Sequence, residues 1–251
     1  MSRDPGLPDI ARFASPIYNQ GACGSCTAFG TLGAVELEIR KMHNTPDEKL
    51  ELSRRDLFSC SGGTCNRGNY VDVTVIAAEK GVALNDDCPY DAMDHSCEQG
   101  RTADWWKRGK KTTKTISFKT HDDMRAALSD GYALVGSMAV YTSFFNYRKG
   151  VYQHLPGERL EGYHCISMHE YDVSDESVLI QNSWGDWGCP NPRRTDQPYG
   201  YCWIKITELD PESFRVVVND DPIPEPGPDP SIWEKIWNWI IILLRRIFGG
   251  K

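Results

Sequence analysis

The residues QGACGSCTAF at positions 20–29 constrain this 251-residue chain more than any other stretch. A glutamine lies six positions before Cys26, and a Gly-Ser pair leads directly into that cysteine. From Ala28 to Arg40 apolar residues recur every three or four positions, so we expect a helix packed on one face. Because the amide groups at a helix N-terminus favour a nearby anion, the pattern indicates a cysteine whose thiolate form is stabilised.

Two further motifs lie in the second half of the chain. His164 belongs to GYHCISM, and Asn182 belongs to IQNSWGDWG. A Cys-Gly-Ser-Cys motif followed by such a histidine and by Asn-Ser-Trp-Gly resembles the papain-like cysteine proteases. The resemblance covers about residues 16–206. Thr27 stands where the family signature has an aromatic residue, which resembles a subset of papain-like proteins from microbes and viruses.

The resemblance implies a cysteine endopeptidase that hydrolyses peptide bonds through a thiolate–imidazolium pair and an acyl-enzyme. It makes Cys26 the nucleophile and His164 the proton carrier. Asn182 would orient the imidazole, and Trp184 would cover that pair. Gln20 would supply the side-chain half of an oxyanion hole. A polypeptide substrate is implied, and no metal or organic cofactor is.

His169 is the alternative proton carrier, because it shares an expected strand with His164. The two histidines are five positions apart. Since successive side chains of a strand alternate between its faces, these two are expected to point to opposite faces. The spacing to the Asn-Ser-Trp-Gly motif favours His164.

The chain changes from helical to strand-like patterns near residue 112. Before that point three helices are expected. One begins at Cys26, one begins after Ser53, which would be its N-cap, and one covers residues 70–80. After it, β-branched and aromatic segments alternate with turn signals, and one helix is expected at residues 121–129. The expected strands are TTKTISF, YALVGSMAV, GVYQH, HCISMHEYDV, SVLIQNSW and GYCWIKI.

A helical half followed by a strand-rich half predicts an α+β fold with a cleft between the halves. The papain-like fold has this two-part build. We therefore expect a protease domain at residues 1–219, with a helical part at about 17–111, a β part at about 112–219, and the active site between them.

The nine cysteines suggest an oxidising compartment, although no apolar run that would form a signal peptide follows Met1. The resemblance implies two disulfides, which would join Cys23 with Cys65 and Cys60 with Cys97. A third is expected between Cys189 and Cys202, because they flank a segment that is an insertion relative to the family. Cys165 is expected to be a buried thiol, and Cys88 has no assigned partner.

Two other readings use the same cysteines. Cys23, Cys26, Cys60 and Cys65 could form a four-thiolate zinc site. Cys23 and Cys26 could also form a redox pair. A zinc site would leave the histidine and asparagine motifs without a role, and a redox pair of the thioredoxin kind needs a strand before the motif.

The segment CNRGNY corresponds to the family's Cys-Asn-Gly-Gly turn. The resemblance implies that the backbone of Gly68 pairs with an extended peptide. Arg67 replaces the other glycine and puts a cation beside the cleft, which would favour acidic substrate residues or would simply be solvated. The net charge of −7 does not suggest a nucleic-acid surface.

The end of the chain has its own composition. Residues 220–230, DDPIPEPGPDP, predict an extended acidic linker, and residues 231–251 predict a Trp-rich amphipathic helix. The apolar run is too short to span a bilayer, so the tail is expected to lie at a membrane interface or to dock on its own domain or a partner. A catalytically silent papain-like binding module, tethered by this tail, is the alternative function.

Overall fold

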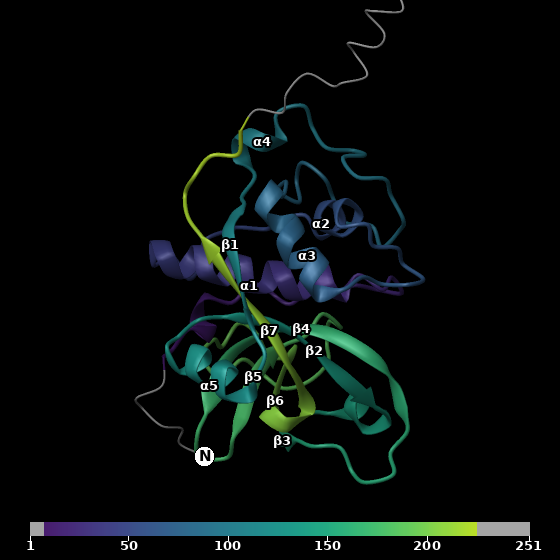
Figure 1. Ribbon diagram of the computed structural model, residues 1–251, viewed down its shortest axis with the longest axis vertical. Coiled ribbons are helices and arrows are strands. Elements are labelled where there is room, and N and C mark those ends of the chain that lie inside the picture. Colours follow the sequence, from purple (N-terminus) through teal and green to yellow (C-terminus); the bar gives the residue numbers. More distant parts are fainter. Residues whose placement is uncertain (1–7, 225–251) are drawn as a thin grey trace, which may run out of the picture.

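The structure, a computed structural model, describes residues 8–224 of the chain. Figure 1 shows two halves, one built of helices and one built around a sheet, with helix α1 between them. The sheet has seven strands in the order β1-β7-β2-β4-β5-β6-β3. The α+β class and the two-part build predicted from the sequence are confirmed.

The helical half contains four α-helices, and the sheet half contains one among the residues described. Their bounds are α1 Cys26–His43, α2 Arg54–Cys60, α3 Val71–Ala77, α4 Trp105–Arg108 and α5 His121–Ser129. Short 3-10 turns lie at Ala11–Phe13, Ala78–Lys80, Thr142–Asn146 and Ile206–Glu208. The strands are β1 Thr112–Phe118, β2 Leu134–Tyr141, β3 Val151–Tyr152, β4 Leu160–Asp172, β5 Ser177–Gln181, β6 Tyr201–Lys205 and β7 Leu209–Val218.

Local sequence signals set several of these bounds. Ser53 caps α2, because its side chain accepts a hydrogen bond from the backbone N–H of Asp56, and Thr120 caps α5 in the same way. Asn44 caps the C-terminus of α1, with a φ of 55° in the left-handed region. Gly81, with a φ of 106°, ends the turn that follows α3.

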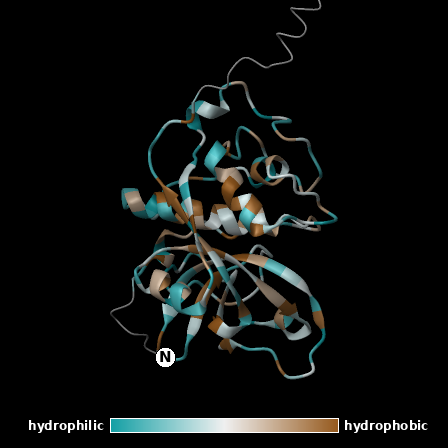
Figure 2. Ribbon diagram, viewed as in Figure 1, coloured by the Kyte–Doolittle hydropathy of each residue, from teal (hydrophilic) through white to brown (hydrophobic). Residues whose placement is uncertain are grey.

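Helix α1 differs from the sequence prediction in its burial. We expected one packed face, but every residue from Thr27 to Arg40 is buried. The helix lies between the other helices and the sheet, so both of its sides are covered (Figure 1). Figure 2 shows hydrophobic segments on the central helices and on the strands. A helix that is covered on all sides can carry apolar residues around its whole circumference, so spacing alone did not reveal its central position.

Two glycines allow α1 to approach strand β4 closely. A Cβ atom at Gly30 would lie 2.9 Å from the Cys165 sulfur, and one at Gly33 would lie 3.0 Å from the Ser167 hydroxyl. A glycine inside a helix costs about 1 kcal/mol relative to alanine, so this contact accounts for two otherwise unfavourable residues. Strand β4 in turn carries both candidate histidines.

Strand β7 and helix α4 were not predicted from the sequence. Strand β7 begins with Leu209-Asp-Pro-Glu, a pattern typical of a turn, yet it pairs with both β1 and β2. The expected strand GVYQH is reduced to Val151–Tyr152, and β4 begins at Leu160 rather than at His164. Long-range pairing, which local patterns do not report, sets the bounds of these strands.

Residues 220–224, the part of the expected linker that the structure describes, pack against the body of the protein. His43 Nε2 lies 2.9 Å from the Asp220 carboxylate, and Ile223 is only 4% exposed, packed with Trp105 and Ala83. Residues up to 224 therefore belong to the packed body, because an apolar side chain covers this end of the helical half. The predicted tail at 231–251 lies outside the described residues. Within residues 8–224, no helix is both long and apolar enough to cross a membrane.

Candidate active site

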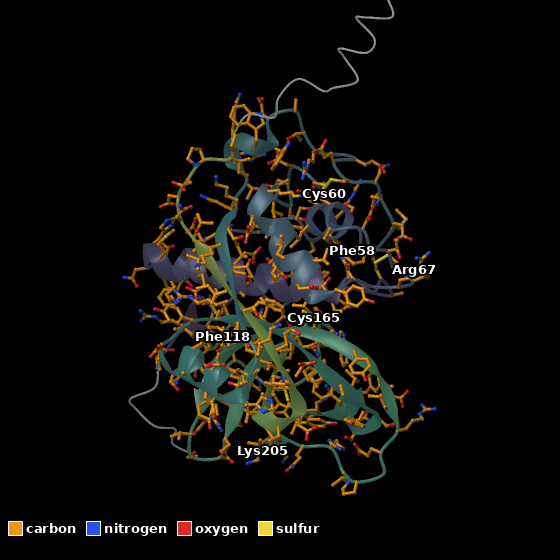
Figure 3. The ribbon with its side chains drawn as sticks, viewed as in Figure 1. Phe58, Cys60, Arg67, Phe118, Cys165 and Lys205 are labelled. Carbon is orange, nitrogen blue, oxygen red and sulfur yellow. A yellow bond between two sulfur atoms is a disulfide. The ribbon has the colours of Figure 1, made fainter. Side chains whose placement is uncertain are left out.

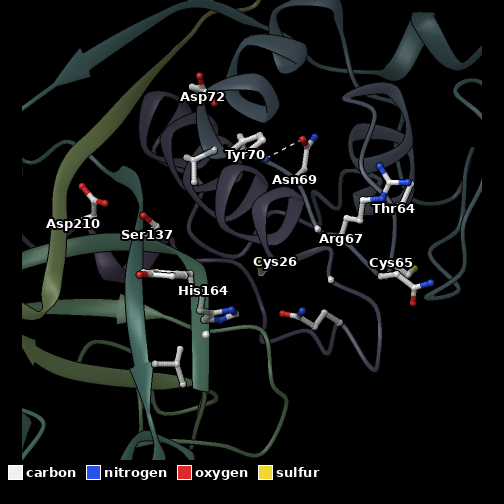
Figure 4. Close-up of a pocket in the computed structure, with 18 of the residues that line it drawn as sticks. Cys26, Thr64, Cys65, Arg67, Asn69, Tyr70, Asp72, Ser137, His164 and Asp210 are labelled. Carbon is white, nitrogen blue, oxygen red and sulfur yellow. Dashed lines mark hydrogen bonds between the residues drawn. The ribbon is translucent and has the colours of Figure 1, made fainter. Parts of the chain in front are cut away.

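A cleft of about 1130 Å³ opens between the two halves (Figure 4). The helical half contributes Cys26 and the turn at 64–72, and the sheet half contributes residues 161–164 and Trp184. Gln20 also lines it. The four residues that the resemblance selected therefore come together: three line the cleft, and Asn182 lies directly behind His164.

Cys26 is the first residue of α1, as predicted. Its side chain is partly buried, and burial raises the pKa of the thiol above its ordinary value. Backbone hydrogen bonds at Cys165, Thr27 and Cys26 itself oppose that rise in pKa, because they favour the thiolate. The backbone groups around the sulfur thus favour the thiolate, but burial has the larger effect on the pKa of the thiol.

His164 and Asn182 form the second part of the site. Asn182 directly follows β5, and β5 pairs with β4, so the two side chains meet at one end of the sheet. His164 Nε2 lies 2.7 Å from Asn182 Oδ1. Because Oδ1 also accepts a hydrogen bond from the Ser183 N–H at 2.7 Å, it is an acceptor and the imidazole donates through Nε2. Nδ1 of His164 is thereby left as the basic nitrogen.

Trp184 lies over the imidazole, as expected. The two ring centroids are 4.7 Å apart at an angle of 38°. Phe145 also stacks on the indole, with ring centroids 5.4 Å apart. Burial lowers the pKa of His164 to about 4, and the hydrogen bond to Asn182 opposes that shift.

Each of these pKa shifts, taken by itself, favours the neutral form of its group: a thiol at Cys26 and an uncharged imidazole at His164. A thiolate is disfavoured by its own burial, and so is an imidazolium. Figure 4 shows Cys26 and His164 in the same part of the cleft, one from each half. Opposite charges that form together stabilise each other, so the pair can become charged only as a unit.

Gln20 is held at both ends of its amide. Its Nε2 donates to the Cys23 carbonyl at 2.9 Å, and its Oε1 accepts from the Ser183 hydroxyl at 2.7 Å. The backbone N–H of Gln20 also donates to the Ser183 carbonyl at 2.9 Å. Ser183 therefore ties the glutamine to the loop that carries Asn182.

Sequence reasoning did not single out Ser183 or Tyr90. Ser183 could have been found from the sequence, because it is the serine of the Asn-Ser-Trp-Gly motif. Tyr90 had no local signal: its hydroxyl donates to the Gln20 carbonyl at 2.8 Å and lies 2.7 Å from the Ser25 hydroxyl. It joins the two residues that flank the nucleophile loop.

His169 lies on the opposite face of β4 from His164, as the strand parity predicts. Its Nε2 lies 2.7 Å from the Ser167 hydroxyl, and the side chain is fully buried. Burial lowers its pKa to about 3, so the ring is neutral. It does not line the cleft.

The two disulfides that the resemblance implied are present, Cys23–Cys65 and Cys60–Cys97. Figure 3 shows Cys60 within the helical half. These bonds occupy three of the four sulfurs that a zinc site would need, and they pair Cys23 with Cys65 rather than with Cys26. Both other readings of these cysteines are therefore wrong. Cys88 and Cys165 are buried thiols.

The predicted disulfide between Cys189 and Cys202 is wrong. Cys189 pairs across the sheet edge with Tyr201, so Cys202 is offset by one residue and is not directly opposite. Its sulfur donates to the Trp203 carbonyl at 3.3 Å, and the Tyr147 hydroxyl lies 3.7 Å from the Cys189 sulfur. The inserted loop is held instead by Arg194, which ion-pairs with Asp47 at 3.0 Å.

Gly68 and Arg67 lie on the turn at the helical rim of the cleft. Gly68 has a φ of 72°, and its N–H donates to the Thr64 carbonyl at 2.8 Å. Its carbonyl accepts from the Thr64 N–H at 3.3 Å. Arg67 is exposed at the edge of the helical half (Figure 3), and among the described side chains it forms no ion pair.

Comparison with known proteins agrees with this fold. The papain family cysteine protease model matches residues 9–194. Gamete and mating-type specific protein A of Dictyostelium discoideum is 30% identical over 71% of this chain and 39% of its own length. Chymopapain of Carica papaya is 32% identical over 69% of this chain and 49% of its own length. Cathepsin B-like CP3 of Giardia intestinalis is 29% identical over 68% of this chain and 61% of its own.

The crystal structure of the Carica candamarcensis cysteine protease CMS1MS2 in complex with E-64 has the same fold. Its TM-score is 0.66 at 22% identity, over 86% of this chain and all of that one. A two-part fold with a thiol at a helix start facing a His–Asn pair defines a papain-like cysteine protease. This chain belongs to the papain family of cysteine proteases. It spans between 39% and 61% of the length of the curated relatives named above.

Proposed function

We propose that this chain is a cysteine endopeptidase. The observation that carries the proposal is the 2.7 Å contact between His164 Nε2 and Asn182 Oδ1, beneath Trp184 and in the cleft that Cys26 lines. That contact leaves His164 Nδ1 basic, which is the state needed to take a proton from a thiol.

In this mechanism, His164 Nδ1 takes the Cys26 proton and the thiolate attacks the peptide carbonyl carbon. The backbone N–H of Cys26 and the side chain of Gln20 stabilise the oxyanion. One Gln20 Nε2 hydrogen is used by the Cys23 carbonyl, and the amide has a second one for the oxyanion. The imidazolium then protonates the leaving amine, and a water activated by His164 hydrolyses the thioester.

The substrate is an extended polypeptide that lies along the cleft. Because the Gly68 N–H already donates to Thr64, the carbonyl of Gly68, with its second lone pair, is the group that pairs with the peptide. Arg67 lacks an ion-pair partner among residues 8–224, so it favours an acidic substrate side chain nearby.

The experiment is peptide hydrolysis by the wild type, Cys26→Ala and Cys165→Ala. Cys165 is a matched control, since its thiol is also buried, but its side chain packs against Gly30 and does not line the cleft. We expect loss of hydrolysis only in Cys26→Ala. A folded wild type that binds peptides but never cleaves them would favour the silent binding module instead.

The two disulfides suit an oxidising or extracytoplasmic setting. Membrane contact through residues 231–251 stays a prediction based on sequence. The packing of Ile223 moves the informative truncation to a chain that ends at Pro224. That chain is expected to stay active and to lose co-sedimentation with anionic vesicles, whereas full-length protein that ignores such vesicles would contradict the prediction.

A further inference from the structure

A small cavity lies behind the active site, separate from the cleft. Its volume is about 20 Å³, and it lies between α1 and the sheet, where Figure 3 shows Cys165. Polar side chains converge on it from several elements. They are Tyr18, Arg54, Ser167, Gln181, Asn182 and Ser183. A volume of about 10–15 Å³ is enough to hold one water molecule, provided that it has two to four polar partners.

Three of these side chains each bring one uncommitted polar atom. Asn182 Nδ2, Gln181 Oε1 and Arg54 Nε are buried and have no hydrogen-bond partner within the described protein. Their residues are 4%, 8% and 2% exposed. Buried donors and acceptors rarely go unpaired, because each loses its hydration on folding.

The orientation of each group is fixed by its other contacts. Asn182 Oδ1 is used by His164 and by the Ser183 N–H, so Nδ2 is the atom left over. Gln181 Nε2 donates to the Ser15 carbonyl at 2.9 Å, which leaves Oε1. Arg54 uses both terminal nitrogens, at 2.6 and 2.9 Å, on the Glu36 carboxylate, which leaves Nε. The residues that line the cavity thus bring two unpaired N–H donors and one unpaired oxygen acceptor.

We propose that this cavity binds one ordered water, which accepts from Asn182 Nδ2 and Arg54 Nε and donates to Gln181 Oε1. Gln181 is thereby a positioning residue for the proposed peptidase reaction, on which this inference rests. If the Asn182 amide rotated by half a turn, Nδ2 would face His164 and the imidazole would change tautomer. A partner that holds Nδ2 in the cavity keeps Oδ1 on the ring and supports the imidazolium.

Burial moves the pKa values of three ionisable groups in and beside the cavity away from neutrality. Burial raises the pKa of Tyr18 and of Cys165 and lowers that of His169 to about 3. Arg54 keeps its charge, because Glu36 and other carboxyl and phenol groups nearby raise the pKa of its guanidinium. A shift in the pH profile on changing Gln181 would therefore report on Cys26 and His164.

The test compares Gln181→Met with Gln197→Met in the full chain. Methionine keeps the length of glutamine and removes its polar atoms. Gln197 is a matched control, because it is also buried and its Nε2 also donates to the Ser15 carbonyl, at 3.1 Å, but it does not line the cavity. Thermal unfolding checks that both variants are folded.

We expect Gln181→Met to lower kcat about tenfold, the size of effect expected when a buried donor loses its acceptor, with little change in KM. The upper pH limb of kcat/KM should move to lower pH, because the imidazolium is less well supported. Gln197→Met should leave that limb in place. An unchanged Gln181→Met, or the same limb shift in both variants, overturns the proposal.

A high-resolution crystal structure of the wild type gives a test that does not depend on turnover. One water within hydrogen-bond distance of the three atoms supports the inference, and an empty cavity overturns it. A wild type without peptidase activity that nonetheless holds this water would overturn the proposed function and leave the water site standing.

Discussion

The two walls of the cleft are held in different ways. Both disulfides lie in the helical half, and Cys23–Cys65 fixes the loop before the nucleophile to the turn that carries Gly68. The sheet half has none among the residues described, and His164 is held there by Asn182 and by aromatic packing. The nucleophile is thus positioned by covalent bonds and the base by hydrogen bonds and packing, so the two should respond to different perturbations.

The largest expected effect comes from removing one partner on either side. Cys26→Ala and His164→Ala should each lower kcat/KM for a fluorogenic peptide by roughly 10⁴-fold or more, because the two groups act as a unit. His169→Gln should keep most of the activity, since its side chain lies on the other face of β4. Loss of activity in His169→Gln alone, in a folded protein, would move the proton carrier.

Removing each disulfide in turn distinguishes its effect on the stability of the fold from its effect on the position of the site residues. Each double alanine variant, Cys23/Cys65 and Cys60/Cys97, should lose about 2–5 kcal/mol of unfolding free energy. Only the Cys23/Cys65 variant should also lose activity, by roughly 10²-fold, because the Cys23 carbonyl holds Gln20 and the Cys65 carbonyl holds Gly24.

Denaturant unfolding and peptide hydrolysis on the same samples measure both quantities. Equal loss of activity in the two variants, after allowing for the unfolded fraction, would show that Cys23–Cys65 has no special role in the site.

A smaller effect is expected from the buried histidine of the sheet half. The pKa of His169 is about 3 in the folded protein against an ordinary value of 6.5, so only the unfolded chain binds a proton between these values. Above pH 6.5 the neutral His169 does not lower the stability of the fold. As the pH falls from 6.5 toward 3, protonation of this histidine in the unfolded chain lowers the free energy of unfolding by up to about 1.4 kcal/mol per pH unit. Unfolding measured from pH 7 to pH 4 should show a shallower slope in His169→Gln. The same slope in both proteins would contradict this prediction.

The smallest effect concerns substrate choice at the helical rim. Arg67→Ala should lower the preference for an acidic over a neutral substrate residue by less than about fivefold, since the guanidinium is exposed and screened by solvent. Paired peptides that differ at one position measure it. A larger loss on neutral peptides than on acidic ones would mean that Arg67 supports the turn instead.

The sequence predicted the motifs at the ends of elements best. Cys26 at a helix start, Ser53 as a cap and the parity of His164 and His169 depend on local spacing, which a single sequence contains. Strand β7, the full burial of α1 and the contacts of Tyr90 depend on what lies across the molecule. The Cys189–Cys202 error has the same origin, because flanking a loop does not place two sulfurs opposite each other.

The site shows the same division. The spacing of Gln20, His164 and Asn182 indicated a shared chemistry through a resemblance to a family. It could not indicate that Ser183 links Gln20 to the Asn182 loop, or that Arg54 and Asn182 line the same cavity. Each of these pairs lies more than one hundred positions apart in sequence, and only the fold brings its members together.

The most direct test of the account is the pH dependence of Cys26 alkylation by iodoacetamide, with the modified residue identified by mass spectrometry. If the thiol and the imidazole become charged only as a pair, the wild type should react well below the ordinary pKa of a thiol. His164→Ala should then react only above that value, because burial raises the pKa of an unpaired Cys26. The same pH profile in both proteins would contradict the account, since the thiolate would then not depend on the imidazole.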